Sequence, residues 1–272
     1  MTRLTGQVAL ITGGSKGIGQ ALAQRLAEQG VRVYLAARDR EQLAAAAAAM
    51  PGEVSALPAD LSRTEGAKAL LAELAQREER LDLLVNCAGQ FDIGPVEALG
   101  PDAAERLIQI NYLGTVRVID AALPMLRQSV RRSIVNVSSL AGCMAPPYMT
   151  AYAASKFAVT GYTRALRQEL RAEGFHVGLI SPGPVDTTLI EGHLGNEYYP
   201  LPPGVPVVRV EVVADAIIRA VTRRKAEVVL PARLGPASRL MSAFPGIVDL
   251  MYRWLAGRAG SKPEPVASNT DK

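Results

Sequence analysis

Short apolar runs rich in β-branched residues alternate along this chain with longer stretches in which apolar residues recur every three or four positions. The short runs predict strands over Val8–Thr12, Arg32–Ala36, Val54–Leu57, Leu81–Asn86, Ser133–Val137, His176–Ile180 and Val228–Leu230. The fifth and sixth of them read as continuous apolar runs, which is typical of strands that are covered on both faces.

Helices are predicted between these strands. The first carries Ile18, Leu22 and Leu26 at four-residue spacing and ends at Gly30. The others are predicted over Arg40–Met50, Thr64–Arg80, Asp102–Arg127, Thr150–Glu173 and Val212–Arg223. This alternation predicts a doubly wound (Rossmann) α/β fold, with a parallel sheet of about seven strands and helices on both faces. Its ligand should lie at the carboxyl ends of the strands, where the strand order reverses.

The 272 residues suit one large domain, which we assign to residues 1–230, including a substrate lid at about 188–210. A C-terminal helical extension is expected over residues 231–260, divided by Pro245-Gly246. Residues 261–272 are polar and contain proline, so we expect a disordered tail.

Composition and charge narrow the class of protein. No apolar run reaches the roughly 18 residues of a transmembrane helix, and the first residues lack the pattern of a signal peptide, which favours the cytoplasm. Cys87 and Cys143 suit neither a disulfide framework nor a metal site. The net charge is +4, and its short basic clusters are better explained by solvated loops than by nucleic acid.

A glycine-rich segment, Thr12–Gly19, follows the first predicted strand and leads into a helix. Glycine permits sharp turns and close approach to a phosphate, and the free amides of the helix would face the same loop. The residues predicted to hold a pyrophosphate are Gly13, Ser15, Lys16, Gly17, Ile18 and Gly19. Glycine loops alone are weak signals, so the flanking residues matter.

The end of the second predicted strand bears on the choice of cofactor. Arg38 stands there instead of the acidic residue that binds the ribose hydroxyls of NAD, and Asp39 comes one step later. Arg38 and Lys16 could flank a 2′-phosphate, which favours NADP(H). The alternative is that both are merely exposed basic side chains.

Two further strand ends offer cofactor contacts. Asp60, followed by Leu61, could accept a hydrogen bond from an adenine amino group or merely cap the next turn. Asn86, Ala88 and Gly89 could let the chain pass beneath a cofactor, although a tight turn alone would explain them.

Tyr152 and Lys156 lie four residues apart in a predicted helix and therefore share one face. A tyrosine with a pKa near 10 is a poor acid–base group at neutral pH, and a nearby ammonium should lower that pKa. Ser139, in the loop after the fifth strand, could hold the substrate oxygen. Together they form an acid–base set for carbonyl reduction or alcohol oxidation.

These motifs, in this order, resemble those of the classical short-chain dehydrogenase/reductase family over roughly residues 5 to 230. The resemblance implies that Tyr152 is the general acid/base, and that Lys156 lowers its pKa and holds the nicotinamide ribose, so that both residues also contact the cofactor. Ser139, thirteen residues before Tyr152, matches the substrate-orienting serine better than Ser138 does. It further implies that Asn111 supports a water-linked proton relay.

The resemblance also implies that residues 182–187 lie beside the nicotinamide, through Pro182, Gly183, Val185 and Thr187. The pairing of Lys16 with Arg38 is similar to that of NADP-preferring members. Cys87 stands where the family often has a second asparagine; because Asn86 remains, this difference does not weaken the resemblance. A homodimer or homotetramer is implied as well.

The sequence says less about the substrate than about the fold or the cofactor. Tyr148, Met149 and Met144 could line its pocket, and few charges occur nearby, so we expect a lipophilic ketone, aldehyde or alcohol. His193, in the predicted lid, could be catalytic but is better explained by lid packing. The apolar tail with Arg239, Arg253 and Arg258 could rest on a membrane; packing over the substrate mouth or against another subunit is favoured.

Two other functions compete with an NADPH-linked carbonyl reductase. Reduction of a 3-oxoacyl thioester is one, although an enzyme with this activity would need a basic surface near its pocket to bind an acidic carrier. A non-catalytic NADP(H)-sensing protein is the other, and the presence of both Tyr152 and Lys156 argues against it.

Overall fold

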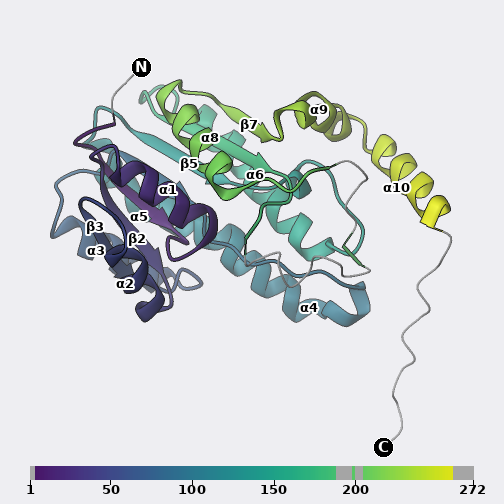
Figure 1. The fold of residues 1–272 in the computed structure, drawn as a ribbon, viewed down its shortest axis with the longest axis horizontal. Helices are drawn as coiled ribbons and strands as arrows, with labels where there is room; N and C mark the ends of the chain where they lie inside the picture. Colours follow the sequence, from purple (N-terminus) through teal and green to yellow (C-terminus); the bar gives the residue numbers. More distant parts are fainter. Residues whose placement is uncertain (1–3, 188–197, 200–204, 260–272) are drawn as a thin grey trace, which may run out of the picture.

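The computed structural model describes residues 4–187, 198–199 and 205–259. In this part of the chain, seven parallel strands form one sheet in the order β3-β2-β1-β4-β5-β6-β7 (Figure 1). They are β1 Val8–Thr12, β2 Arg32–Ala37, β3 Val54–Pro58, β4 Leu83–Asn86, β5 Ser133–Val137, β6 His176–Pro182 and β7 Glu227–Leu230. The predicted fold class is confirmed, and the strand order reverses between β1 and β4.

Helices cover both faces of the sheet because the strand side chains alternate between two apolar cores. In β1, Ala9 and Ile11 belong to one core and Val8 and Leu10 to the other, and all four are fully buried. The first core packs against α1 Gly17–Ala27, α2 Arg40–Ala48 and α8 Val210–Thr222, and the second against α3 Thr64–Ala75, α5 Gly114–Arg127 and α6 Thr150–Glu169.

Residues 102–127 are helical throughout, as predicted, but they do not form one regular α-helix. The segment consists of α4 Val96–Leu107, a π-helical stretch η1 Ile108–Leu113 and α5. Within α4, Gly100 (φ 60°) kinks the helix before Pro101. A π-helical turn holds an extra residue and often marks a functional site, and here it carries Asn111. Two further predicted helices end earlier than expected, at Ala75 in α3 and at Glu169 in α6.

After β7 the chain forms a short turn, η3 Ala232–Leu234, and then two helices, α9 Gly235–Ala243 and α10 Pro245–Ala259. Figure 1 shows these helices running outward beyond β7 at one side of the fold. No helix among the described residues has the length and apolar character needed to cross a membrane. Most of the predicted lid, including His193, and the tail 261–272 lie outside the described residues.

Candidate active site

The segment from the end of β1 into the first turn of α1 accepts only glycine at two positions. Gly13 has a φ of +69°, and a Cβ there would lie 2.9 Å from the Cα of Ala88. A Cβ on Gly19 would lie 2.3 Å from the carbonyl oxygen of Gly13. Helix α1 then begins at Gly17 with no side-chain cap and no acid in its first turn. Its free amides and positive end can therefore receive a phosphate.

A cleft of about 730 Å³ lies above this loop, within the size range of small-ligand sites. With one exception, the residues predicted to bind cofactor line it: Gly13, Ser15, Lys16, Gly17, Ile18, Gly19, Arg38, Asp60, Leu61, Ala88, Gly89, Tyr152, Lys156, Pro182, Gly183, Val185 and Thr187. Sequence reasoning missed other residues on the same wall, such as Gln42, Ser62 and Gln90.

Asn86 is the exception. Its side chain is buried, and its Nδ2 donates to Oδ1 of Asn136 at 2.9 Å. Nδ2 of Asn136 in turn donates to Oγ1 of Thr163. Asn86 therefore ties β4 to β5 and α6 instead of lining the cleft.

At the rim of the cleft, two basic side chains are exposed while a neighbouring carboxylate caps a helix. Lys16 and Arg38 are exposed there. The carboxylate of Asp39 accepts from the backbone N–H of Gln42 at 3.0 Å and caps α2. Because that carboxylate is engaged, the cations remain available to an anionic ligand.

Asp60 both lines the cleft and caps the turn that follows β3. Its Oδ1 accepts from the backbone N–H of Ser62 at 3.0 Å. Hydrogen bonds from Ser62, with a smaller effect of Arg38, lower the pKa of Asp60. The structure thus shows the capping contact that the sequence left as one of two alternatives.

Tyr152 and Lys156 are buried side by side on α6. The Nζ of Lys156 donates to the carbonyl oxygen of Val137 at 3.1 Å and lies 5.8 Å from the ring centroid of Tyr152. Burial lowers the pKa of Lys156 to about 8. Burial raises the pKa of Tyr152 to about 12, although a hydrogen bond with Ser139 opposes that change.

The expected lowering of the Tyr152 pKa by Lys156 is therefore not seen. Burial disfavours the charged phenolate, and this effect outweighs the opposing hydrogen bond with Ser139. A protonated Tyr152 at neutral pH is the form needed by a general acid.

The two serines after β5 have different surroundings. Oγ of Ser138 donates to the carbonyl oxygen of Lys156 at 3.0 Å and contacts Thr160, so it holds α6 in place. Ser139 accepts from the backbone N–H of Ala141 at the start of η2 Leu140–Gly142. Ser139 also lines the cleft and a second cavity, whereas Ser138 lines only the cleft.

Asn111 is 1% exposed and lies behind the cleft. Its Oδ1 accepts from the backbone N–H of Gln90 at 2.7 Å, and its Nδ2 donates to the carbonyl oxygen of Gln90 and to Oγ of Ser155. The side chain thus joins the loop after β4 to α6. Its part in a proton relay stays a prediction.

A second cavity, of about 240 Å³, opens beside Tyr152 and shares Ser139, Tyr152 and Gly183 with the cleft. None of the described residues that line it is charged. Met144 and Met149 line it as predicted, together with Phe91, Leu140, Ala141, Pro146, Pro184, Tyr199, Val205, Leu234, Ala237, Ser238, Met241, Met251 and Tyr252. Tyr148, also predicted to line it, instead packs against the ring of Tyr198 at 5.0 Å.

The C-terminal wall of this cavity was not predicted residue by residue. The signal was the apolar spacing of Ala237 and Met241, which lie four apart in α9, and of Val248 and Met251 in α10. That spacing indicates a buried face but not what the face covers.

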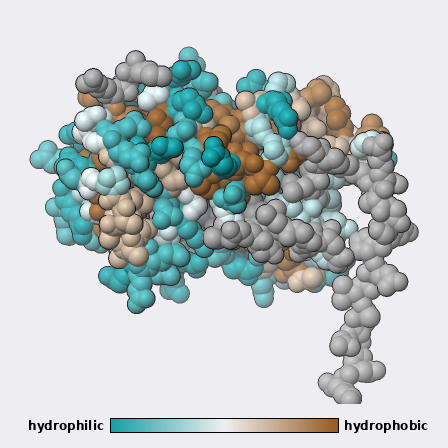
Figure 2. Space-filling view, viewed as in Figure 1, coloured by the Kyte–Doolittle hydropathy of each residue, from teal (hydrophilic) through white to brown (hydrophobic). Residues whose placement is uncertain are grey.

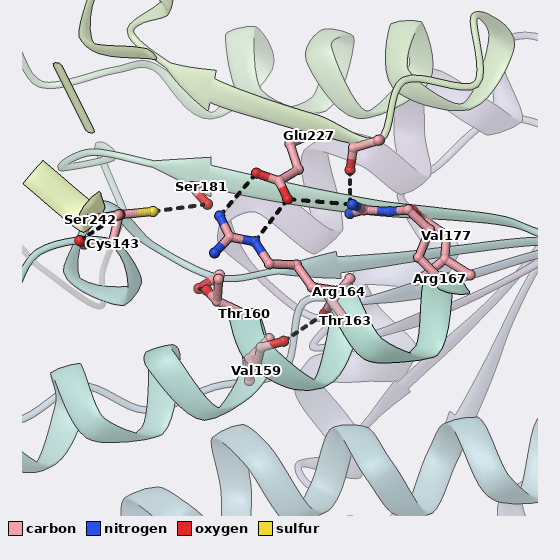
Figure 3. A network of polar contacts seen from close by, with 12 residues as sticks. Cys143, Val159, Thr160, Thr163, Arg164, Arg167, Val177, Ser181, Glu227 and Ser242 are labelled. Carbon is pink, nitrogen blue, oxygen red and sulfur yellow. Dashed lines mark hydrogen bonds and ion pairs between the residues drawn. The ribbon is translucent and has the colours of Figure 1, made fainter. Parts of the chain in front are cut away.

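A polar network in the C-terminal half of α6 ties the catalytic helix to the last strand (Figure 3). Glu227 of β7 accepts from Nε and Nη2 of Arg164 at 2.9 and 3.2 Å, and Arg167 donates to it at 3.4 Å. Nearby, Oγ of Ser242 in α9 donates to the carbonyl oxygen of Cys143 at 2.9 Å. These contacts hold α6 to β7 and α9 to the segment that follows η2.

A family-wide sequence profile described as short chain dehydrogenase matches residues 7–196. The chain belongs to the short-chain dehydrogenase family. It is 37% identical over 201 residues to the Pseudomonas aeruginosa rhamnolipids biosynthesis 3-oxoacyl-[acyl-carrier-protein] reductase, covering 71% of this chain and 78% of that protein. It is 32% identical to an uncharacterized oxidoreductase of Staphylococcus aureus over 82% of this chain and 94% of the other.

Solved structures agree with this assignment. The Pseudomonas aeruginosa RhlG/NADP active-site complex has a TM-score of 0.72 and 32% identity, over 84% of this chain and 95% of that chain. A variant of actinorhodin polyketide ketoreductase with NADPH has a TM-score of 0.76 and 26% identity, over 84% of this chain and 97% of the other.

Proposed function

We propose that this protein is an NADP(H)-dependent oxidoreductase that interconverts a lipophilic ketone or aldehyde and the corresponding alcohol. One observation carries the proposal. Tyr152 and Ser139 stand where the large cleft meets a cavity whose described lining has no charged side chain. A carbonyl group held at that junction would have the cofactor on one side and its apolar substituents on the other.

The residues of the cleft fit a dinucleotide phosphate. The tight turn at Gly13 and Gly19 and the uncapped start of α1 suit a pyrophosphate, and Lys16 and Arg38 would flank a 2′-phosphate. NADP structures of two similar proteins support this choice. NADPH, when bound, supplies the hydride for the carbonyl carbon.

Tyr152 acts as general acid in reduction and donates its phenolic proton to the carbonyl oxygen. Its raised pKa keeps that proton in place at neutral pH. Ser139 donates a second hydrogen bond to the same oxygen. Lys156 supplies positive charge that stabilises the phenolate left behind, and Asn111 positions the loop at Gln90 that faces the cleft.

A second candidate is reduction of a 3-oxoacyl thioester, and the name of the Pseudomonas aeruginosa relative favours it. An acyl chain would suit the uncharged cavity equally well. We further propose a cytoplasmic homodimer or homotetramer, since Phe157 of α6 is 43% exposed and offers an apolar contact to a second copy.

A substrate panel tests the activity. Purified protein with NADPH is expected to reduce neutral ketones with an efficiency that rises with their apolar area, and to reject keto acids of equal size. Failure to oxidise NADPH with any ketone, aldehyde or 3-oxoacyl thioester would refute the proposal. Faster turnover of thioesters than of simple ketones would select the second candidate.

A further inference from the structure

Helices α9 and α10 each present one apolar face inward. Met241 of α9 and Met251 and Tyr252 of α10 line the substrate cavity, and Val248 is 7% exposed. The same helices therefore form part of the wall that a lipophilic substrate would touch.

A second apolar face of the same helices is exposed. The structure has ten exposed large apolar side chains among its described residues, and five lie within this one segment: Leu240, Phe244, Ile247, Leu250 and Trp254. Their exposed fractions run from 37% to 64%. Ile247, Leu250 and Trp254 are three or four residues apart within α10 and so share one side of it, and Leu240 and Phe244 lie at the end of α9. In Figure 2, hydrophobic colour appears at the end of the molecule where Figure 1 places α9 and the start of α10, separate from a larger area near the middle of the same face. A concentration of this kind on one surface marks an interaction site.

The charges beside this face are mostly positive. Arg233, Arg239 and Arg253 are exposed on η3, α9 and α10, and Asp249 is the one acidic residue of this segment among the described residues. A second copy of the chain, packed face to face, would bring the same arginines together. An anionic bilayer surface instead supplies the opposite charge to the arginines and an apolar interior to Leu250 and Phe244. Trp254 is the residue type that prefers the boundary between the two.

We propose that α9 and α10 dock on an anionic lipid bilayer, with Leu240, Phe244, Ile247, Leu250 and Trp254 in the membrane interface and the arginines at the lipid headgroups. The substrate cavity, whose wall is the inner face of the same helices, then loads its lipophilic substrate from the bilayer. Only this loading step rests on the proposed function.

The chain has a single tryptophan, so Trp254 is a built-in probe of the docking face. The full-length protein is mixed with vesicles of phosphatidylcholine alone or with phosphatidylglycerol added. Flotation with the anionic vesicles, a blue shift of Trp254 emission and its quenching by brominated lipid are expected. Binding should weaken when salt is raised.

Matched variants separate the apolar and the charged contributions. Phe244→Ser combined with Leu250→Ser should abolish flotation, whereas Val130→Ser, at a valine 93% exposed and remote from α9 and α10 in sequence, should leave it unchanged. Arg239→Gln and Arg253→Gln should each weaken binding roughly fivefold. Circular dichroism and turnover of a water-soluble ketone establish that each variant is folded, since none of these residues lines the cleft or the substrate cavity.

Three outcomes would overturn the docking proposal. The protein could fail to float with anionic vesicles, or could float without any change in Trp254 emission. It could also bind in a way that needs the arginines but ignores Phe244 and Leu250, as an acidic protein partner would. In each case turnover of a water-soluble ketone still tests the oxidoreductase activity separately, so failure of the one is distinguishable from failure of the other.

Discussion

Cofactor choice depends on two cations at the rim of the cleft, Lys16 and Arg38. Replacing Arg38 with Gln removes one charge and the guanidinium donors, while Asp39 can keep its capping bond to the N–H of Gln42. The substitution should therefore weaken NADPH binding without disturbing α2. Lys16→Gln removes the second cation in the same way.

The size of the effect follows from exposure. A hydrogen bond to a charged group contributes about 1.5–3 kcal/mol, and both side chains are exposed, so the lower value applies. Each substitution should then reduce kcat/KM for NADPH about tenfold, and the pair about a hundredfold if the effects add. NADH has no 2′-phosphate, so its kcat/KM should stay within about twofold.

The assay is steady-state oxidation of each cofactor with one saturating ketone, for the wild type, both single variants and the double variant. Thr5→Ala provides a control, because this exposed side chain contacts the carbonyl of Gln29 and does not line the cleft. Wild-type preference for NADH, or an equal loss with both cofactors in the double variant, would refute the reasoning.

Three further predictions follow from the described geometry. Gly19→Ala forces a Cβ against the carbonyl oxygen of Gly13, so it should lower the free energy of unfolding by about 1–3 kcal/mol and also weaken NADPH binding. Gly161→Ala, where the added Cβ meets open space, should do neither. Equal melting temperatures for the two variants would contradict this. The rate of ketone reduction should stay constant around neutral pH and fall above about pH 8, where Lys156 loses its charge. The rate of alcohol oxidation should rise with pH as Tyr152 releases its proton. A rate of reduction that increases at high pH would contradict the roles given to these two residues. Burial raises the pKa of Glu227, but the larger combined effect of Arg164 and Arg167 leaves that pKa below its usual value. The ion pairs of Glu227 therefore stabilise the fold at neutral pH, and this stabilisation is lost as the pH falls below the unfolded value of about 4.3. Glu227→Gln should cost about 1 kcal/mol in urea unfolding at pH 7 and nothing in acid.

Local patterns in the sequence were enough to predict the sheet and the phosphate loop. Both depend on neighbours in the chain: strands such as β1 and β5 are short, largely apolar runs that are buried at every position, and the glycines from Gly13 to Gly19 close one turn. The π-helical stretch around Asn111 could not be predicted, because apolar spacing reports which side is buried and not which carbonyl each amide reaches.

Two features of the site could not be predicted from the sequence, because they depend on contacts between residues far apart in the chain. Asn86 stands at the end of β4, next to the cleft, yet its side chain points to Asn136 on the neighbouring strand. The substrate cavity joins Phe91, Tyr199 and Tyr252, which are far apart in sequence and meet only through tertiary packing. For the apolar tail, the sequence favoured packing over the substrate mouth or against another subunit, and in the structure Met241, Met251 and Tyr252 line the cavity.

The most direct test of the account compares Tyr152→Phe with Tyr199→Phe. Both substitutions keep the aromatic ring and remove one hydroxyl from the wall of the substrate cavity, but only Tyr152 also lines the cleft. Tyr152→Phe should lower kcat for ketone reduction by about 10²–10⁴-fold while NADPH still binds, and Tyr199→Phe should retain most activity. Comparable kcat values in the Tyr152→Phe variant and the wild type would contradict the central claim.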